Sequence, residues 1–233
     1  MSPSPSGPGP IIAVVGLARE AGIATSPAVR PVIGGGAGPG LTSTLERIVA
    51  EGARAIISFG IAGGLDPFLA AGTCIVGSAA TMGVARWPTD AGWAARLVAA
   101  LPGAVLADIA GTDQPIATHD HKRLLRAATG AAAVDMESHR AARVAAAHGL
   151  PFAIVRIVCD PSSRSLPPAA LVGMRHDGTS DVGAVLRALT AAPSQLPGLI
   201  RLALDARIAF AQLKRRRDSL GGDFAMGNAD VDA

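Results

Sequence analysis

Two acidic residues follow an apolar segment at a spacing that suits sugar binding. The segment VDMES (Val134–Ser138) carries Asp135 and Glu137 from a predicted strand into the start of a predicted helix. A carboxylate there can accept hydrogen bonds from two adjacent hydroxyls, such as those of a ribose. The alternative is structural, because a helix dipole stabilises an acid in the first turn, where Glu137 could also pair with Arg140.

A third acid, Asp160, ends the apolar segment PFAIVRIVCD (Pro151–Asp160) and precedes the proline-rich PSSRSLPP. A carboxyl group shielded by such a loop can hold or deliver a proton near neutral pH. An ordinary Asp-Pro turn is the structural alternative.

Glycine-rich segments follow other predicted strands, at Gly16, Gly34–Gly40 and Gly60–Gly63. None fits the dinucleotide fingerprint G-x-G-x-x-G, and no lysine follows them as in a P-loop. They are either tight turns or a ligand cradle. His119 and His121 lack a third ligand nearby, so we expect a polar loop there and no metal site.

These residues must be positioned by alternating strands and helices. Continuous apolar runs at 11–15, 55–59 and 151–158 are typical of strands buried on both faces. We therefore expect one α/β domain over residues 11–190, with a central mixed, mostly parallel sheet flanked by helices. Ligands bind beyond the carboxyl ends of such strands, where the acids and glycines lie. The other expected strands are 31–33, 73–78, 104–109 and 131–134, and the expected helices are 41–52, 91–101, 122–128, 136–148 and 178–190.

A separate amphipathic helix is expected over residues 191–219, ending in the basic run Lys214–Arg217. Residues 1–10 and 220–233 are expected to be disordered. The predicted apolar face of the helix consists of Leu196, Leu199, Ile200, Ala203, Ile208 and Leu213.

The composition is that of a folded protein, with 49% hydrophobic and 17% charged residues. A net charge of only +3 and 3% aromatic residues argue against a nucleic-acid partner. Two distant cysteines, no signal peptide and no long apolar run predict a reduced, cytoplasmic protein without a membrane span.

Taken in order, these segments resemble the nucleoside phosphorylase and methylthioadenosine/adenosylhomocysteine nucleosidase superfamily over about residues 11–190. The resemblance implies an enzyme that needs no cofactor, forms a homo-oligomer and binds a nucleoside. It implies that Glu137 binds the sugar hydroxyls, Met136 packs against the sugar and Asp160 protonates the purine. The other implied substrate-binding residues are Gly60, Ile61, Ala62, Gly63, Asp135 and Cys159.

The stretch from VDMESHR to GMRHDG, together with QLPGLIRLALDAR, is similar to the hopanoid-associated phosphorylase branch. That resemblance implies cleavage of the N-glycosidic bond of adenosylhopane, releasing adenine and leaving a ribosyl or phosphoribosyl hopane. Because this substrate is a lipid, the C-terminal helix could lie at the inner membrane face. The alternative is that the helix packs on the domain or on a second subunit.

The sequence does not decide whether water or inorganic phosphate accepts the sugar. Glu20 lies one residue earlier than the family's water-activating glutamate, and Ser58 and Ile61 stand where phosphorylases hold phosphate. No base-stacking Phe occurs near residues 118–123. The candidates for the acceptor site are Gly16, Arg19, Glu20, Arg30, Gly34, Gly35 and Gly36.

Two other functions remain. One is a methylthioadenosine/adenosylhomocysteine nucleosidase, and the other is a purine-nucleoside binding module without catalytic activity. A Rossmann-type oxidoreductase is disfavoured, because its glycine fingerprint is absent.

Overall fold

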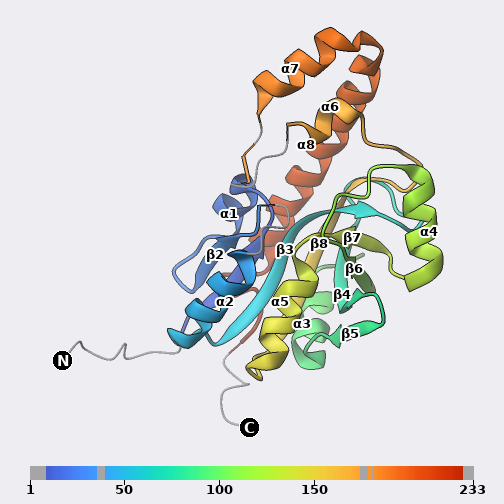
Figure 1. Cartoon of the computed structure of the whole chain (residues 1–233). Coiled ribbons are helices and arrows are strands. Elements are labelled where there is room, and N and C mark those ends of the chain that lie inside the picture. Colours follow the sequence, from blue (N-terminus) through green and yellow to red (C-terminus); the bar gives the residue numbers. More distant parts are fainter. Residues whose placement is uncertain (1–8, 36–39, 174–177, 180, 228–233) are drawn as a thin grey trace.

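The computed structural model describes residues 9–35, 40–173, 178–179 and 181–227. An eight-stranded mixed sheet is flanked by helices (Figure 1). The strands are β1 (Ile11–Val15), β2 (Val29–Ile33), β3 (Ala55–Gly64), β4 (Cys74–Met82), β5 (Ala85–Pro88), β6 (Val105–Gly111), β7 (Ala133–Asp135) and β8 (Phe152–Asp160). The helices are α1 (Ala18–Ala24), α2 (Gly40–Ala50), α3 (Ala91–Ala100), α4 (His119–Thr129), α5 (Ser138–Ala147), α6 (Pro168–Leu171), α7 (Val182–Ala191) and α8 (Leu196–Ser219), with a 3-10 turn at Pro193–Gln195.

The strand pairings are mostly parallel, as predicted. β1 pairs in parallel with β2 and β3, β3 with β8, β4 with β6, and β6 with β7. The antiparallel pairs are β3 with β7, β4 with β5, and β4 with β8. Strands β3, β8, β4, β6 and β7 thereby close a ring, which brings the ends of β3, β7 and β8 together.

Alternating side chains of β1 explain why its sequence is apolar throughout. Ile11, Ala13 and Val15 face a core shared with α1, α3 and α8, whereas Ile12 and Val14 face a core shared with α2 and α5. The strand is therefore covered on both faces, and no polar residue is tolerated on either side.

The prediction of a disordered tail from residue 220 is wrong for residues 220–227. Leu220, Phe224 and Met226 are buried in the core beneath α3 and α8. The Phe224 ring lies 5.0 Å from that of Phe59, and the indole Nε1–H of Trp93 donates to the Phe224 carbonyl at 2.9 Å. The glycine- and aspartate-rich composition hid three anchoring apolar residues, which only the folded core reveals. Residues 228–233 and 1–8 lie outside the described part of the chain.

The C-terminal helix is present as α8, but it begins at Leu196 rather than at residue 191, and its buried face differs from the predicted one. Leu213 is buried, whereas the predicted face members Leu196, Ile200 and Ile208 are 46–53% exposed. The inner face instead includes Asp205 and Arg217, which periodicity of apolar residues cannot detect. Both charges are paired: Asp205 contacts Arg164, and Arg217 donates to the Ala24 carbonyl.

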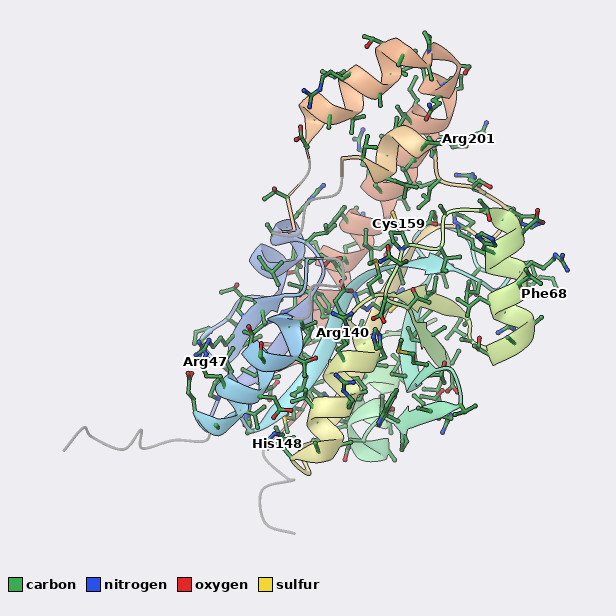
Figure 2. All side chains as sticks on the ribbon, viewed as in Figure 1. Arg47, Phe68, Arg140, His148, Cys159 and Arg201 are labelled. Atoms are coloured by element: carbon green, nitrogen blue, oxygen red, sulfur yellow. The ribbon has the colours of Figure 1, made fainter. Side chains whose placement is uncertain are left out.

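Helix α7 and the first half of α8 project beyond the sheet (Figure 1). None of the residues of α7 is buried. This projection, residues 182–204, carries exposed Val182, Leu186, Leu196, Ile200 and Leu204. Figure 2 shows Arg201 on the same projection and, elsewhere on the surface, the 93% exposed Phe68.

Candidate active site

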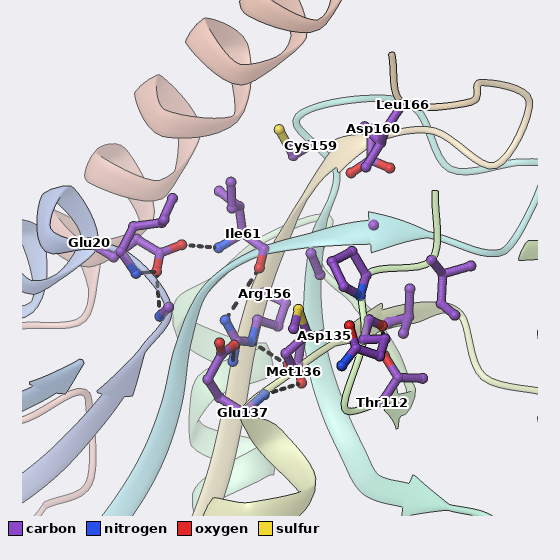
Figure 3. A pocket seen from close by; sticks show the side chains of 18 of the residues that line it. Glu20, Ile61, Thr112, Asp135, Met136, Glu137, Arg156, Cys159, Asp160 and Leu166 are labelled. Carbon is purple, nitrogen blue, oxygen red and sulfur yellow. Dashed lines mark hydrogen bonds and ion pairs between the residues drawn. The ribbon is translucent and has the colours of Figure 1, made fainter. Parts of the chain in front are cut away.

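A cavity of about 370 Å³ opens where β3, β7 and β8 end (Figure 3). Such a volume lies near the small end of ligand sites, which span about 300–1,000 Å³. Its walls combine buried acids, one arginine and apolar side chains. They consist of Gly16, Leu17, Glu20, Gly35, Ile61, Ala62, Gly63, Thr112, Gln114, Pro115, Ile116, Val134, Asp135, Met136, Glu137, Arg156, Cys159, Asp160, Leu166, Leu171 and Thr179.

Glu20, on α1, is 1% exposed, and backbone groups hold it at the cavity wall. Gly16 N and Leu17 N donate to Oε2 at 2.7 and 2.8 Å, and Ile61 N donates to Oε1 at 2.7 Å. Burial raises the pKa of Glu20, while Arg156 and these backbone N–H groups oppose the shift. The carboxyl group is thus fixed in position and is a stronger base than an exposed glutamate.

Three glycines make room for the two cavity glutamates. A Cβ at Gly60 would lie 2.5 Å from Glu20 Oε1, and a Cβ at Gly34 would lie 2.6 Å from Glu137 Cγ. A Cβ at Gly16 would lie 3.2 Å from Glu137 Oε1. Gly34 and Gly60 therefore stand behind the carboxylates rather than at the cavity surface, and Gly36 lies outside the described residues.

Arg156, on β8, is the central cation of the site, and the sequence reading missed it. Its Nε lies 2.7 Å from Asp135 Oδ2, and its Nη2 lies 3.5 Å from Glu137 Oε2 and donates to Ser58 Oγ at 2.6 Å. At 1% exposure, an unpaired guanidinium would be too costly to bury, so these partners are required. The detectable signal was a single arginine inside an otherwise apolar strand segment.

Asp135 has a structural part in the site. Its Oδ1 accepts from Ser138 N at 2.9 Å at the start of α5, and its Oδ2 pairs with Arg156. Ser138 Oγ donates to Ser58 Oγ at 2.8 Å, which ties α5 to β3. This network fixes where the neighbouring Glu137 stands.

Glu137 is 5% exposed and reaches the same cavity as Asp160. Burial raises the pKa of Glu137 to about 7, with Arg156 opposing the shift and Asp135 and Glu20 adding to it. The structural alternative for Glu137, an ion pair with Arg140, is wrong. Arg140 Nη2 instead lies 2.5 Å from Asp113 Oδ1. Glu137 therefore points inward rather than along its helix.

Asp160 ends β8 at the far side of the cavity in Figure 3. Burial raises its pKa, and the ammonium of Lys122, 2.5 Å from Oδ2, opposes that rise. Lys122 is a second residue that the sequence reading did not assign to the site. Burial and the Lys122 ammonium therefore act in opposite directions on the pKa of this carboxyl group.

Most of the residues expected to bind substrate lie in the cavity wall, although Gly60 does not. Ile61, Ala62, Gly63 and Met136 line the cavity, as does Cys159. Burial raises the pKa of the Cys159 thiol to about 12, so it is not a nucleophile at neutral pH. None of the lining residues in the described part of the chain is aromatic.

Two arginines considered for the acceptor do not line the cavity. The Arg19 guanidinium lies 4.2 Å above the Phe210 ring, and Arg30 pairs with Glu51 at 2.8 Å on the surface. Arg156 is the only Lys or Arg among the lining residues that the structure describes. In the described part of the chain, no group of three or more His, Cys, Asp or Glu residues is arranged to hold a metal ion.

The sequence model of the phosphorylase superfamily matches residues 28–191 of this chain. The chain therefore belongs to that superfamily. This confirms the predicted enzyme class, nucleoside phosphorylase or nucleosidase. A search of curated protein sequences finds no match.

Solved structures share the fold at low sequence identity. The 5′-methylthioadenosine/S-adenosylhomocysteine nucleosidase of Helicobacter pylori has a TM-score of 0.63 and 15% identity, over 92% of this chain and 100% of the other. The S-adenosylhomocysteine nucleosidase of Streptococcus pyogenes has a TM-score of 0.59 and 17% identity, over 90% and 98%. The futalosine hydrolase of Helicobacter pylori has a TM-score of 0.59 and 15% identity, over 84% and 97%. These likenesses confirm the predicted α/β architecture.

Proposed function

We propose that this chain is a nucleosidase that cleaves the N-glycosidic bond of a 5′-substituted adenosine and releases adenine. The observation that carries the proposal is the convergence of Glu20, Glu137 and Asp160 on one cavity. Glu20 and Glu137 are buried, the Asp160 side chain is 13% exposed, and burial raises the pKa of each. Three such acids around a nucleoside-sized space suit protonation of the base, binding of the sugar and activation of the acceptor.

Asp160 supplies the proton. Adenine leaves poorly as an anion, so a proton on N7 lowers the barrier to breaking the C1′–N9 bond. Substituting D160N removes the proton and should lower the rate of adenine release by about 10²-fold or more. The matched control is D120N, on an exposed residue of α4. Near-normal turnover by D160N would remove Asp160 from this role.

Glu137 binds the 2′- and 3′-hydroxyls, and its charge stabilises the oxocarbenium character that the sugar acquires. Arg156 holds the carboxylate in place from the far side. Met136 packs against the sugar and offers no competing nucleophile.

Water is the acceptor that this site favours. A phosphate dianion would lie beside Glu20 and Glu137, and the only described cation in the wall already pairs with Asp135 and Glu137. Glu20 is instead placed to accept a proton from water as the C–O bond to C1′ forms. Incubation in H₂¹⁸O with and without phosphate tests this choice. We expect ¹⁸O in the sugar product at either phosphate level, whereas a sugar 1-phosphate would identify a phosphorylase.

Among 5′-substituted adenosines, we infer that adenosylhopane is the substrate. A cavity of about 370 Å³ accommodates the adenosyl group, so a polycyclic hydrocarbon must lie outside it. Leu166 and Leu171 give part of the cavity wall an apolar character. The exposed Val172 comes directly after Leu171, the last residue of α6. Mass analysis of products from adenosylhopane, adenosine and 5′-methylthioadenosine tests the inference.

Because adenosylhopane is a lipid, we also infer that the projection of residues 182–204 contacts the membrane surface. Its large exposed side chains are apolar apart from Arg187 and Arg201, and it has no acid. Such a surface suits an anionic bilayer. No helix within the described ranges combines the length and apolar character needed to cross a membrane.

Vesicle sedimentation tests this contact without removing the buried half of α8. The L186S/I200S/L204S variant should lose binding to vesicles containing anionic lipid, while V84S, on an exposed loop, should not. Unchanged binding would contradict the membrane contact. A drop in oligomer size instead, measured by light scattering, would assign the surface to the predicted homo-oligomer.

A second candidate substrate is 5′-methylthioadenosine or S-adenosylhomocysteine. The cavity volume and the fold shared with nucleosidases that carry those substrates in their names favour it. Turnover of these molecules but not of adenosylhopane would select it. Tight nucleoside binding without adenine release would identify the non-catalytic binding module.

A further inference from the structure

The side chain of Lys122 is 0% exposed, which is unusual for a lysine. It extends from α4 to the end of β8. Its Nζ donates to Asp160 Oδ2 at 2.5 Å and to the backbone carbonyls of Asp160, Pro161 and Arg164, each at 3.1 Å. Every acceptor belongs to the strand end and turn that present Asp160 to the cavity.

The four oxygen acceptors around Nζ suit an ammonium group, which has only donors. A buried ammonium loses its hydration, so it requires acceptors in return, and the three carbonyls with one carboxylate supply them. The bonds also restrict the turn after β8 and therefore the direction of the Asp160 side chain. Lys122 occupies Oδ2 and Asp160 lines the cavity, so Oδ1 is the oxygen that the proposed mechanism uses.

We propose that Lys122 is a positioning residue that fixes Asp160 through Oδ2 and stabilises the carboxylate that remains after Asp160 gives its proton to the purine. This proposal rests on the proposed nucleosidase function. In the step itself, the Asp160 O–H bond breaks as the N7–H bond forms, and the C1′–N9 electron pair moves to the purine. The negative charge left on Asp160 then lies against the Lys122 ammonium.

The charge argument depends on what else surrounds Asp160. Among the residues that the structure describes, Lys122 is the ionisable side chain that acts on the pKa of Asp160, and it opposes the rise caused by burial. Removing the ammonium should therefore make Asp160 a weaker acid. Other ionisable groups of the described residues also lie near Asp160. On one side these are His119 on α4, whose ring contacts the Ser162 carbonyl, and the Arg164–Asp205 pair and Arg201 across a neighbouring hollow. In the cavity wall they are Glu20, Asp135, Glu137, Arg156 and the Cys159 thiol.

The test compares K122M and K122Q with wild type over a range of pH, using adenine release from 5′-methylthioadenosine and adenosylhopane. The K122Q variant keeps hydrogen-bond donors without the charge, and it carries the test where K122M does not fold. We expect kcat to fall about 10- to 100-fold in either variant, because the general acid is weakened. Since activity needs protonated Asp160, the basic limb of kcat/KM should move to higher pH.

Two controls separate positioning from general stability. R217M removes another buried cation that binds backbone carbonyls, far along α8 from the cavity, and should lower Tm without moving the pH profile. The K122M/D160N double variant should have nearly the same kcat as D160N, because Lys122 acts through Asp160. K122M should still lower Tm in that background. An unshifted basic limb together with a full rate loss in the D160N background would overturn the proposal.

A direct titration of Asp160 tests the role of Lys122 independently of the proposed nucleosidase function. The ¹³C carboxyl resonance of Asp160, assigned by its loss in D160N, reports the proton without any turnover. If the wild type releases no adenine, the nucleosidase function fails, but the resonance must still titrate at higher pH in K122Q than in wild type. An identical titration in both proteins would overturn the role of Lys122 even in an active enzyme.

Discussion

Gly60 lies directly against the carboxyl group of Glu20: a Cβ at position 60 would stand 2.5 Å from Oε1 and 2.8 Å from Arg156 Nη1. The backbone there, with φ of +153°, also lies in a region that side chains disfavour. The absence of a side chain thus sets the place of both charged groups.

The first prediction concerns G60A. The added methyl should displace Glu20 and Arg156, and misplacement by about 1 Å can cost about 10²-fold in rate. Steady-state adenine release measures the loss. The control is G22A, on the same helix as Glu20, where a Cβ meets nothing within 4 Å. Equal activities of the two variants would show that the packing of Gly60 does not matter for catalysis.

The second prediction concerns E20Q. An amide cannot take a proton from water, so kcat should fall about 10²- to 10⁴-fold while nucleoside binding persists. Binding is measured by calorimetry and kcat by adenine release. E51Q, which disturbs the exposed pairs with Arg30 and Arg47, is the matched control and should be near wild type. Restoration of E20Q activity by phosphate would contradict hydrolysis.

The third prediction is a pH dependence of stability. Burial raises the pKa of Glu137 from 4.5 to about 7, so the folded state holds a proton that the unfolded chain has released between these values. The contribution of Glu137 to the free energy of unfolding therefore decreases from about pH 4.5 to about pH 7. E137Q should gain about 1–3 kcal/mol relative to wild type over that interval.

Urea unfolding of E137Q and wild type, compared at each pH, measures this difference. The comparison cancels the opposite contribution of His139, whose pKa is lowered by burial in both proteins. A constant difference from pH 4.5 to pH 8 would show that Glu137 titrates as an exposed acid.

The fourth prediction concerns the C-terminal segment. Phe224 is fully buried against Phe59 and under the Arg217 guanidinium, so F224A should cost about 3–5 kcal/mol of unfolding free energy. The control, F68A, removes a ring that is 93% exposed and should change little. Equal stability of the two variants would mean that residues 220–227 contribute nothing to the fold.

The sequence alone determined the architecture, because buried strands and flanking helices leave different periodicities of apolar residues. Runs such as 11–15 can be covered on both faces only within a layered α/β fold, which the structure confirms. The segments ending in Glu137 and Asp160 were also recognisable, since acids directly after apolar strands have no place in a core. Their convergence on one cavity followed from the meeting of strand ends at one edge of the sheet.

Only the tertiary structure decided which charges support these acids. Arg156 and Lys122 lie 34 residues apart in sequence, and the sequence assigned neither of them to the site, yet each is buried against a cavity carboxylate. The tertiary structure likewise turned Arg19 and Arg30 away from the cavity and buried Phe224. The physical reason is that a lone charge becomes tolerable in the core only when folding brings a distant partner within hydrogen-bond distance, and such partners leave no local pattern.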